Sequence, residues 1–154
     1  MSDTRRRAGG TPADARADWI ASTTIGGVLA RSAARRPEHD AVVFPGTRET
    51  YAETYAASER VARALRAQGV ERGDVVAVLM PNCPAFVHAF FACALLGARA
   101  LLVNARYKTH ELAYVLRDAD AAAVLTTDVV SEYVDFVPLL DACLLYTSPS
   151  PRDS

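Results

Sequence analysis

The sequence lacks most of the features that mark specialised classes of protein. Its 154 residues include only three cysteines and three histidines, and 17 Lys and Arg residues against 18 Asp and Glu residues leave a net charge of −1. Three cysteines make no disulfide framework and suit a reducing compartment, so we expect a cytoplasmic protein. The balanced charge provides no general attraction to nucleic acid or to an anionic membrane surface.

Long apolar runs are also missing. The very apolar stretch Ala85 to Ala98 has about 14 residues, whereas a membrane-spanning helix needs about 20. Arg5-Arg6-Arg7 is followed by small and polar residues rather than by the apolar stretch of an export signal. We therefore expect a soluble globular protein without a membrane span, in which residues 1–20 form a disordered tail.

Complete catalytic motifs are absent as well. The sequence contains no G-x-x-x-x-G-K-[ST], no G-x-G-x-x-G behind a strand, and no G-x-S-x-G. His39, His88 and His110 fall on different predicted elements without metal-ligand spacing, and we interpret Asp118 and Asp120 as solvated turn acids. The residues alone therefore predict neither a catalytic residue nor a metal site.

The first half of the chain carries clear boundary patterns. We predict a helix from Thr24 to Arg36, and two short strands over 40–45 and 48–51 with a turn at Gly46. The sequence Thr50-Tyr51-Ala52-Glu53 has the form of a capping box, which predicts a helix behind it. Gly69 is predicted to end that helix.

The second half alternates strand and helix patterns. Apolar runs at 74–80 and 98–104 predict buried strands of a parallel sheet, and the run at 121–127 predicts a third strand. Helices are predicted to start near Pro84 and behind a Thr109 N-cap, and a further helix is predicted within 129–142. The fold class that follows is α/β: a partial, doubly wound, largely parallel sheet with flanking helices.

One residue of the apolar helix after the first of these strands allows more than one interpretation. His88 interrupts that helix, and it is either a partnered histidine at a helix–sheet margin or a substrate-contacting residue. Cys83 and Cys93 lack the C-x-x-C spacing of zinc or redox pairs, so we interpret them as small packing residues.

Three segments, in this order, resemble a known family. They are "RSAARRPEHDAVVF", "TYAETYAASERVARALRAQGVERGDVVAVLMPNCPAFVHAFFACALLGA" and "VNARYKTHELAYVLRDADAAAVLTTD". Together they resemble the N-terminal portion of the adenylate-forming superfamily, the AMP-dependent synthetases and ligases, and most of all bacterial acyl-CoA or aryl-CoA ligases. The resemblance implies that residues 21–142 are the N-terminal part of the large adenylate-forming domain.

The resemblance also implies a reaction and its cofactors. The family joins a carboxylic acid to ATP, with Mg²⁺ neutralising the phosphates, and then transfers the acyl group from AMP to a thiol, usually that of coenzyme A. The family's phosphate loop, its acidic adenine and magnesium motif, its ribose-binding aspartate and its catalytic lysine would all come after the end of this sequence. The resemblance therefore assigns no catalytic residue, and we expect the chain alone to be inactive and to bind ATP, Mg²⁺ and CoA poorly.

Two matched elements carry functional expectations. Pro81-Asn82 matches the family's Pro-Asn turn, and Asn104-Ala105-Arg106 matches its Asn-x-Arg element. The resemblance implies that Arg106, and less specifically Lys108, contacts a phosphate of CoA, for which a guanidinium is well suited. A loop arginine that pairs locally is the alternative.

The last residues, "CLLYTSPSPRDS", differ in character from the rest. They look like the translation of a transposase-type sequencing adapter, so we expect 143–154 to be a non-native tail, with a native proline-rich linker as the alternative. Two further hypotheses about function remain open. The chain could be a stand-alone α/β binding module, or it could belong to an adenylation domain that uses a carrier-protein thiol.

Overall fold

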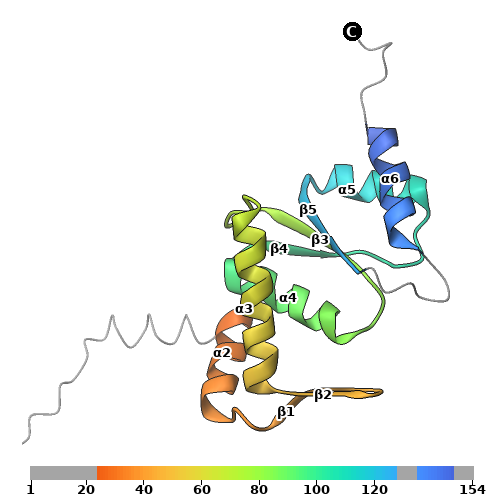
Figure 1. Ribbon diagram of the computed structural model, residues 1–154. Helices are drawn as coiled ribbons and strands as arrows, with labels where there is room; N and C mark the ends of the chain where they lie inside the picture. The colour runs from red at the N-terminus through yellow and green to blue at the C-terminus, as the bar shows by residue number, and fades with distance from the viewer. Residues whose placement is uncertain (1–23, 128–134, 148–154) are drawn as a thin grey trace, which may run out of the picture.

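The computed structural model describes residues 24–127 and 135–147 (Figure 1). The expected tail at 1–20, and the parts of the other predictions that fall on 128–134 and 148–154, lie outside the described residues. The elements are α2 (Ile25–Arg35), β1 (Asp40–Phe44), β2 (Thr47–Thr50), α3 (Tyr51–Ala67), β3 (Val75–Leu79), α4 (Pro84–Leu96), β4 (Arg99–Leu102), α5 (Thr109–Asp118), β5 (Ala121–Thr126) and α6 (Phe136–Thr147).

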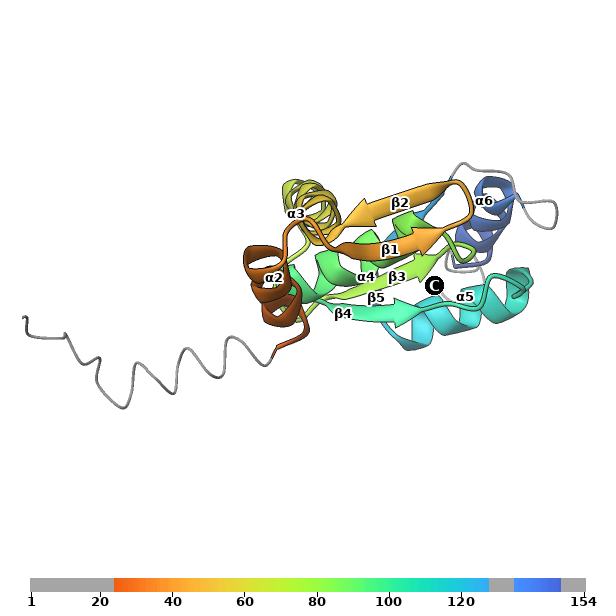
Figure 2. The ribbon, with the colours of Figure 1, turned by 90° about the horizontal axis from the view of Figure 1, so that it is seen from below.

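The first half forms as its boundary patterns predict. Strands β1 and β2 pair antiparallel, joined through Gly46 at φ 76°, and their arrows run in opposite directions in Figure 2. The capping box of α3 is complete: Glu53 donates its N–H to the Thr50 hydroxyl at 3.2 Å, and Thr50 donates its N–H to the Glu53 carboxylate at 2.8 Å. Gly69, at φ 90°, follows the helix in the left-handed conformation that favours glycine.

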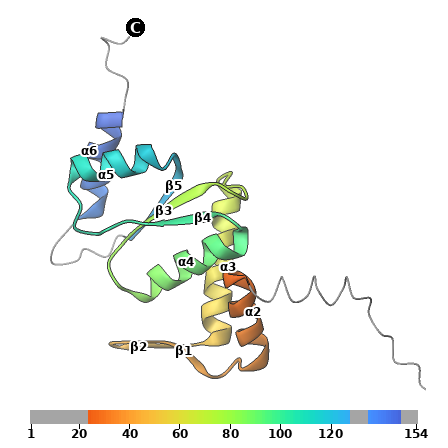
Figure 3. The same ribbon diagram turned by 180° about the vertical axis from the view of Figure 1, so that it is seen from behind.

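The second half forms a parallel sheet with the order β4-β3-β5. All five residues of the central strand β3 are buried, and its side chains alternate between the two faces of the sheet, as the pleat requires. Val76 packs in one cluster with side chains of α3 and α4, whereas Ala77 and Leu79 pack in the other with side chains of α5 and α6. Figures 1 and 3 show the same two helical layers on opposite sides of the sheet. The predicted fold class is confirmed.

Two details of the sequence prediction are wrong. Strand β4 is not buried: it is an edge strand of the described sheet, as β5 is on the other side, and Leu102 at its end is 50% exposed. The prediction failed because an apolar run in the sequence does not distinguish an edge strand of a sheet from a central strand. Thr109 is not the N-cap of α5 but its first residue; Lys108 holds the cap position, and its N–H donates to the Glu111 carboxylate at 2.9 Å.

Helix α6 crosses the boundary expected between Ala142 and Cys143. Cys143 is buried, and its thiol donates to the carbonyl oxygen of Thr109 at 3.4 Å. The non-native origin of 143–154 stays a prediction, because a helical pattern continued by a foreign sequence can pack in the same way.

Candidate functional site

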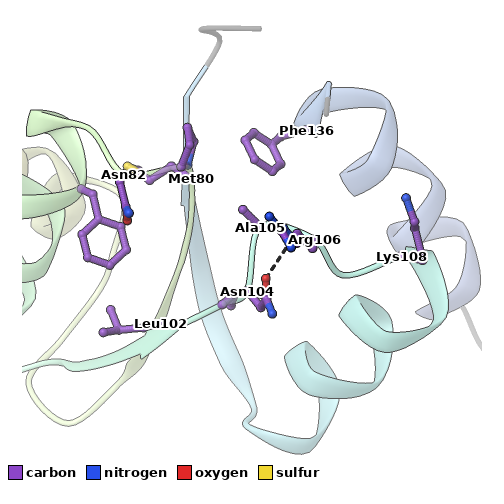
Figure 4. Close-up of a pocket in the computed structure, with 11 residues that line it drawn as sticks. Met80, Asn82, Leu102, Asn104, Ala105, Arg106, Lys108 and Phe136 are labelled. Carbon is purple, nitrogen blue, oxygen red and sulfur yellow. Dashed lines mark hydrogen bonds between the residues drawn. The ribbon is translucent and has the colours of Figure 1, made fainter. Parts of the chain in front are cut away.

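A pocket of about 850 Å³ opens where β3 and β4 end (Figure 4). One wall comes from the turn after β3 and the start of α4, a second from the end of β4 and the loop behind it, and a third from α6. The lining residues are Met80, Pro81, Asn82, Phe86, Leu102, Val103, Asn104, Ala105, Arg106, Lys108 and Phe136.

The chain path explains why a pocket forms at this place. Behind β3 the chain passes through α4 on one face of the sheet to β4, and behind β4 it passes through α5 on the other face to β5, on the far side of β3. The two connections leave the sheet in opposite directions and open a crevice between them. Open α/β sheets bind their ligands at such a point, outside the carboxyl ends of the strands.

The polar part of the pocket comes from the loop behind β4. The Asn104 side-chain oxygen accepts the Arg106 N–H at 3.0 Å, and this short turn fixes the path of the loop (Figure 4). Arg106 lies on the side of Phe136, whereas Lys108 stands further off at the start of α5. Within 24–127 and 135–147 neither cationic side chain forms an ion pair, so both are available to an anion.

His88 lies elsewhere, and the structure does not bring it together with Arg106 and Lys108. Its Nε2 is 2.6 Å from Oε2 of Glu49 on β2, and the two side chains are only 16% and 18% exposed. Thr54 of α3 donates its hydroxyl to the same carboxylate oxygen at 3.4 Å. His88 is therefore a partnered histidine that ties α4 to the hairpin, and its contact with a substrate stays a prediction.

Sequence reasoning missed the apolar half of the pocket. Phe86, Leu102 and Phe136 lie on three separate elements. For Phe86 and Leu102 a usable pattern existed, because each lies within a few residues of the end of a predicted strand. Phe136 follows the segment 128–134, so its place could not be inferred from spacing.

Groups with a perturbed pKa lie outside this pocket. The pKa of the Tyr55 phenol is raised by its hydrogen bond to Glu59, at 3.0 Å, and further by burial. Burial raises the pKa of both Cys93 and Cys143. A thiol with a raised pKa is a poor nucleophile, which agrees with the interpretation of Cys93 as a packing residue.

The described part of the chain contains neither a metal-ligand cluster nor a membrane-spanning helix. No group of three or more His, Cys, Asp and Glu side chains there could hold a metal ion, so none of these residues is assigned as a magnesium ligand. No helix among them has the length and apolar character needed to cross a bilayer.

The fold and the pocket together define a class: an open α/β protein with a mixed apolar and cationic pocket at the switch point of its sheet. The sequence matches the family of AMP-binding enzymes over residues 29–149, and the chain belongs to that family. The resemblance seen in the sequence is thereby confirmed.

Relatives in this family are CoA ligases for different acids. The chain is 33% identical over 111 residues to a long-chain-fatty-acid–CoA ligase of Bacillus subtilis, covering 72% of this chain and 20% of the relative. It is 37% identical over 126 residues to a feruloyl-CoA synthase of Amycolatopsis, covering 82% and 25%. The chain thus spans about a fifth to a quarter of the length of these curated relatives.

Solved structures agree with this assignment. A fatty acyl CoA synthetase of Mycobacterium tuberculosis matches with a TM-score of 0.73 at 34% identity, over 82% of this chain and 24% of that one. An O-succinylbenzoate coenzyme A synthetase of Bacillus subtilis, solved with AMP, matches with a TM-score of 0.64 at 33% identity, over 73% and 32%.

Proposed function

We propose that this chain forms the N-terminal part of an ATP-dependent, AMP-forming acyl-CoA ligase, and that its pocket holds a phosphate of CoA. The observation that carries the proposal is the position of Arg106: a guanidinium without an ion-pair partner among the described residues, held by a fixed turn, at the switch point of the sheet. Relatives for fatty and aromatic acids alike are CoA ligases, which supports CoA as the shared substrate.

The proposed reaction has two displacements. A carboxylate oxygen of the acid attacks the α-phosphorus of ATP, and the bond to pyrophosphate breaks to give the acyl-adenylate. The deprotonated thiol of CoA then attacks the acyl carbon, and AMP leaves. No described residue takes part in bond making; Arg106, with Lys108 at the rim, provides positive charge and forked donors that orient CoA.

A first test concerns the chain by itself. We expect no exchange of pyrophosphate into ATP with any carboxylic acid, because the resemblance assigns the ATP-binding motifs to residues that this chain does not contain. Exchange above the level of a protein-free control would contradict the expectation.

The decisive test uses the complete ligase with Arg106→Ala. Loss of a hydrogen bond to a charged group costs about 1.5–3 kcal/mol, so KM for CoA should rise about 10- to 100-fold, while the rate of pyrophosphate exchange stays unchanged. Arg60→Ala, an exposed arginine on α3 outside the pocket, is the matched control. Lys108→Ala should raise KM for CoA less than Arg106→Ala.

A CoA analogue sharpens this test. If Arg106 contacts the 3′-phosphate, the unaltered ligase should bind 3′-dephospho-CoA more weakly than CoA, and the Arg106→Ala variant should no longer distinguish the two. An unchanged KM for CoA in the variant would show that Arg106 does not contact CoA. Acylation of a carrier-protein thiol instead of CoA would favour the adenylation-domain hypothesis.

A further inference from the structure

A second pocket, remote from the first, lies where the end of α2 meets the start of α3. It measures about 540 Å³, and its lining consists of Arg31, Ser32, Arg35, Arg36 and Tyr51. The arginines and the serine come from the last turns and the C-cap of α2, and the tyrosine is the first residue of α3. Figure 3 shows these two helix ends at the same end of the molecule, beside the hairpin.

Among the residues that the structure describes, no ion pair neutralises the positive charge of this pocket. Helix α2 and its cap contain no acidic residue. Of the acids that follow along the chain, Glu38 is exposed and forms no ion pair with these arginines, Asp40 pairs with Arg48, and Glu53 accepts the N–H of Thr50. In the described ranges none of the three pocket arginines forms an ion pair.

Helix stability explains only part of this arrangement. Cations in the last turn of a helix interact favourably with its dipole, which accounts for Arg35 and for Arg36. Arg31 lies one turn earlier, and like charges spaced i, i+4 on a helix repel each other, so the pair Arg31 and Arg35 is unfavourable without an anion. The helix dipole also gives no reason for Tyr51, from another helix, to line the same pocket.

We propose that this pocket binds the phosphate groups of a small anionic ligand, a phosphomonoester or a diphosphate. Guanidinium groups bind phosphate oxygens with two parallel N–H donors, and three of them around one pocket match the charge of a diphosphate. The hydroxyl groups of Ser32 and Tyr51 add uncharged hydrogen-bond donors to the pocket. The proposal does not depend on the CoA site, because the two pockets share no residue.

The test is a titration of the chain with inorganic pyrophosphate at constant ionic strength. Binding is measured by isothermal titration calorimetry and by the NMR signals of the arginine side chains. The double variant Arg31→Gln/Arg35→Gln should bind at least tenfold more weakly than the unaltered chain. The control Arg60→Gln/Arg66→Gln removes the same charge from the exposed face of α3 and should bind normally. The side-chain NMR signals of Arg31, Arg35 and Arg36 should shift during the titration, which separates binding in this pocket from binding in the first one.

Several results would overturn the proposal. Equal weakening in both double variants would mean that pyrophosphate senses net charge and not the pocket. Shifts confined to the Arg106 signals would assign the anion to the first pocket. The chain could also sediment with vesicles of phosphatidic acid and lose this binding in Arg31→Gln/Arg35→Gln, while soluble pyrophosphate does not bind. That result would assign the arginine patch to a membrane surface. Matching circular dichroism melts of the variants would exclude a folding defect as the cause.

Discussion

Strand β3 and its neighbour β4 are built from similar apolar residues but have different surroundings. Every residue of β3 is buried, whereas both ends of β4 are exposed and its inner residues are half-buried. Strand β3 has a hydrogen-bonded neighbour on each side and helices on both faces, and β4 has a described neighbour on one side only. The difference therefore arises from position in the sheet and not from composition.

The comparison shows that the central strand of the described sheet is fully covered, whereas the edge strand β4 is partly exposed to solvent. Leu102 on β4 and Val43 on β1 are apolar side chains that are 50% and 62% exposed. Such exposure is expected where part of a fold is not covered by its neighbouring segments. The chain spans about a fifth to a quarter of its curated relatives. We infer that the remainder of a longer protein covers these surfaces.

The largest expected effect tests this contrast directly. Val76→Asp places a carboxylate at a position that is 0% exposed, between sheet and helices, and should cost more than about 3 kcal/mol or prevent folding. Leu102→Asp introduces the same group on β4 in place of a half-buried side chain and should lower the free energy of unfolding by only about 1 kcal/mol. Urea unfolding followed by circular dichroism measures both. Equal losses would show that β4 is as buried as β3.

A smaller effect is expected where α4 meets the hairpin. His88→Ala leaves the mostly buried Glu49 without its closest partner and should cost about 1–3 kcal/mol. His39→Ala, at an exposed position, is the control and should be neutral within about 0.5 kcal/mol. A melting temperature of the His88 variant equal to that of the control would show that the pair does not hold the hairpin.

The smallest effect distinguishes a threonine that caps a helix from one that does not. Thr50→Ala removes one half of the capping box of α3 and should cost about 1 kcal/mol. Thr109→Ala removes a hydroxyl that does not cap α5 and should cost clearly less. Thermal melts of the two variants under identical conditions make the comparison; a larger loss for Thr109→Ala would contradict it.

Much of the fold could be predicted because local chemistry decides it. The capping box at Thr50, the turn at Gly46 and the helix end at Gly69, with φ 90°, each depend on a few neighbouring residues. The order β4-β3-β5 and the exposure of β4 depend on contacts between distant segments, which no local pattern contains. Thr109 shows the limit at short range, since a suitable capping residue stood one position inside the helix.

The candidate site was predicted only in part, because local patterns identify some of its residues and tertiary contacts bring in the others. Arg106 was found through a short element shared with a family and Lys108 as a less specific candidate beside it, and both line the pocket. His88 attracted notice as a polar residue in an apolar helix, and the structure gives it a partner, Glu49, that lies 39 residues away along the chain. Phe136 was missed because only the tertiary fold brings α6 to the ends of the strands.

The most direct test of the central claim, that this chain is the first part of a larger ligase, is a long sequencing read of the source DNA across the codons for Ala142 and Cys143. We predict that the reading frame continues past Ala142 into a Ser/Thr/Gly-rich phosphate loop. A genome that encodes "CLLYTSPSPRDS" followed by a stop codon would contradict the claim. In that case a stand-alone α/β binding module would become the preferred interpretation.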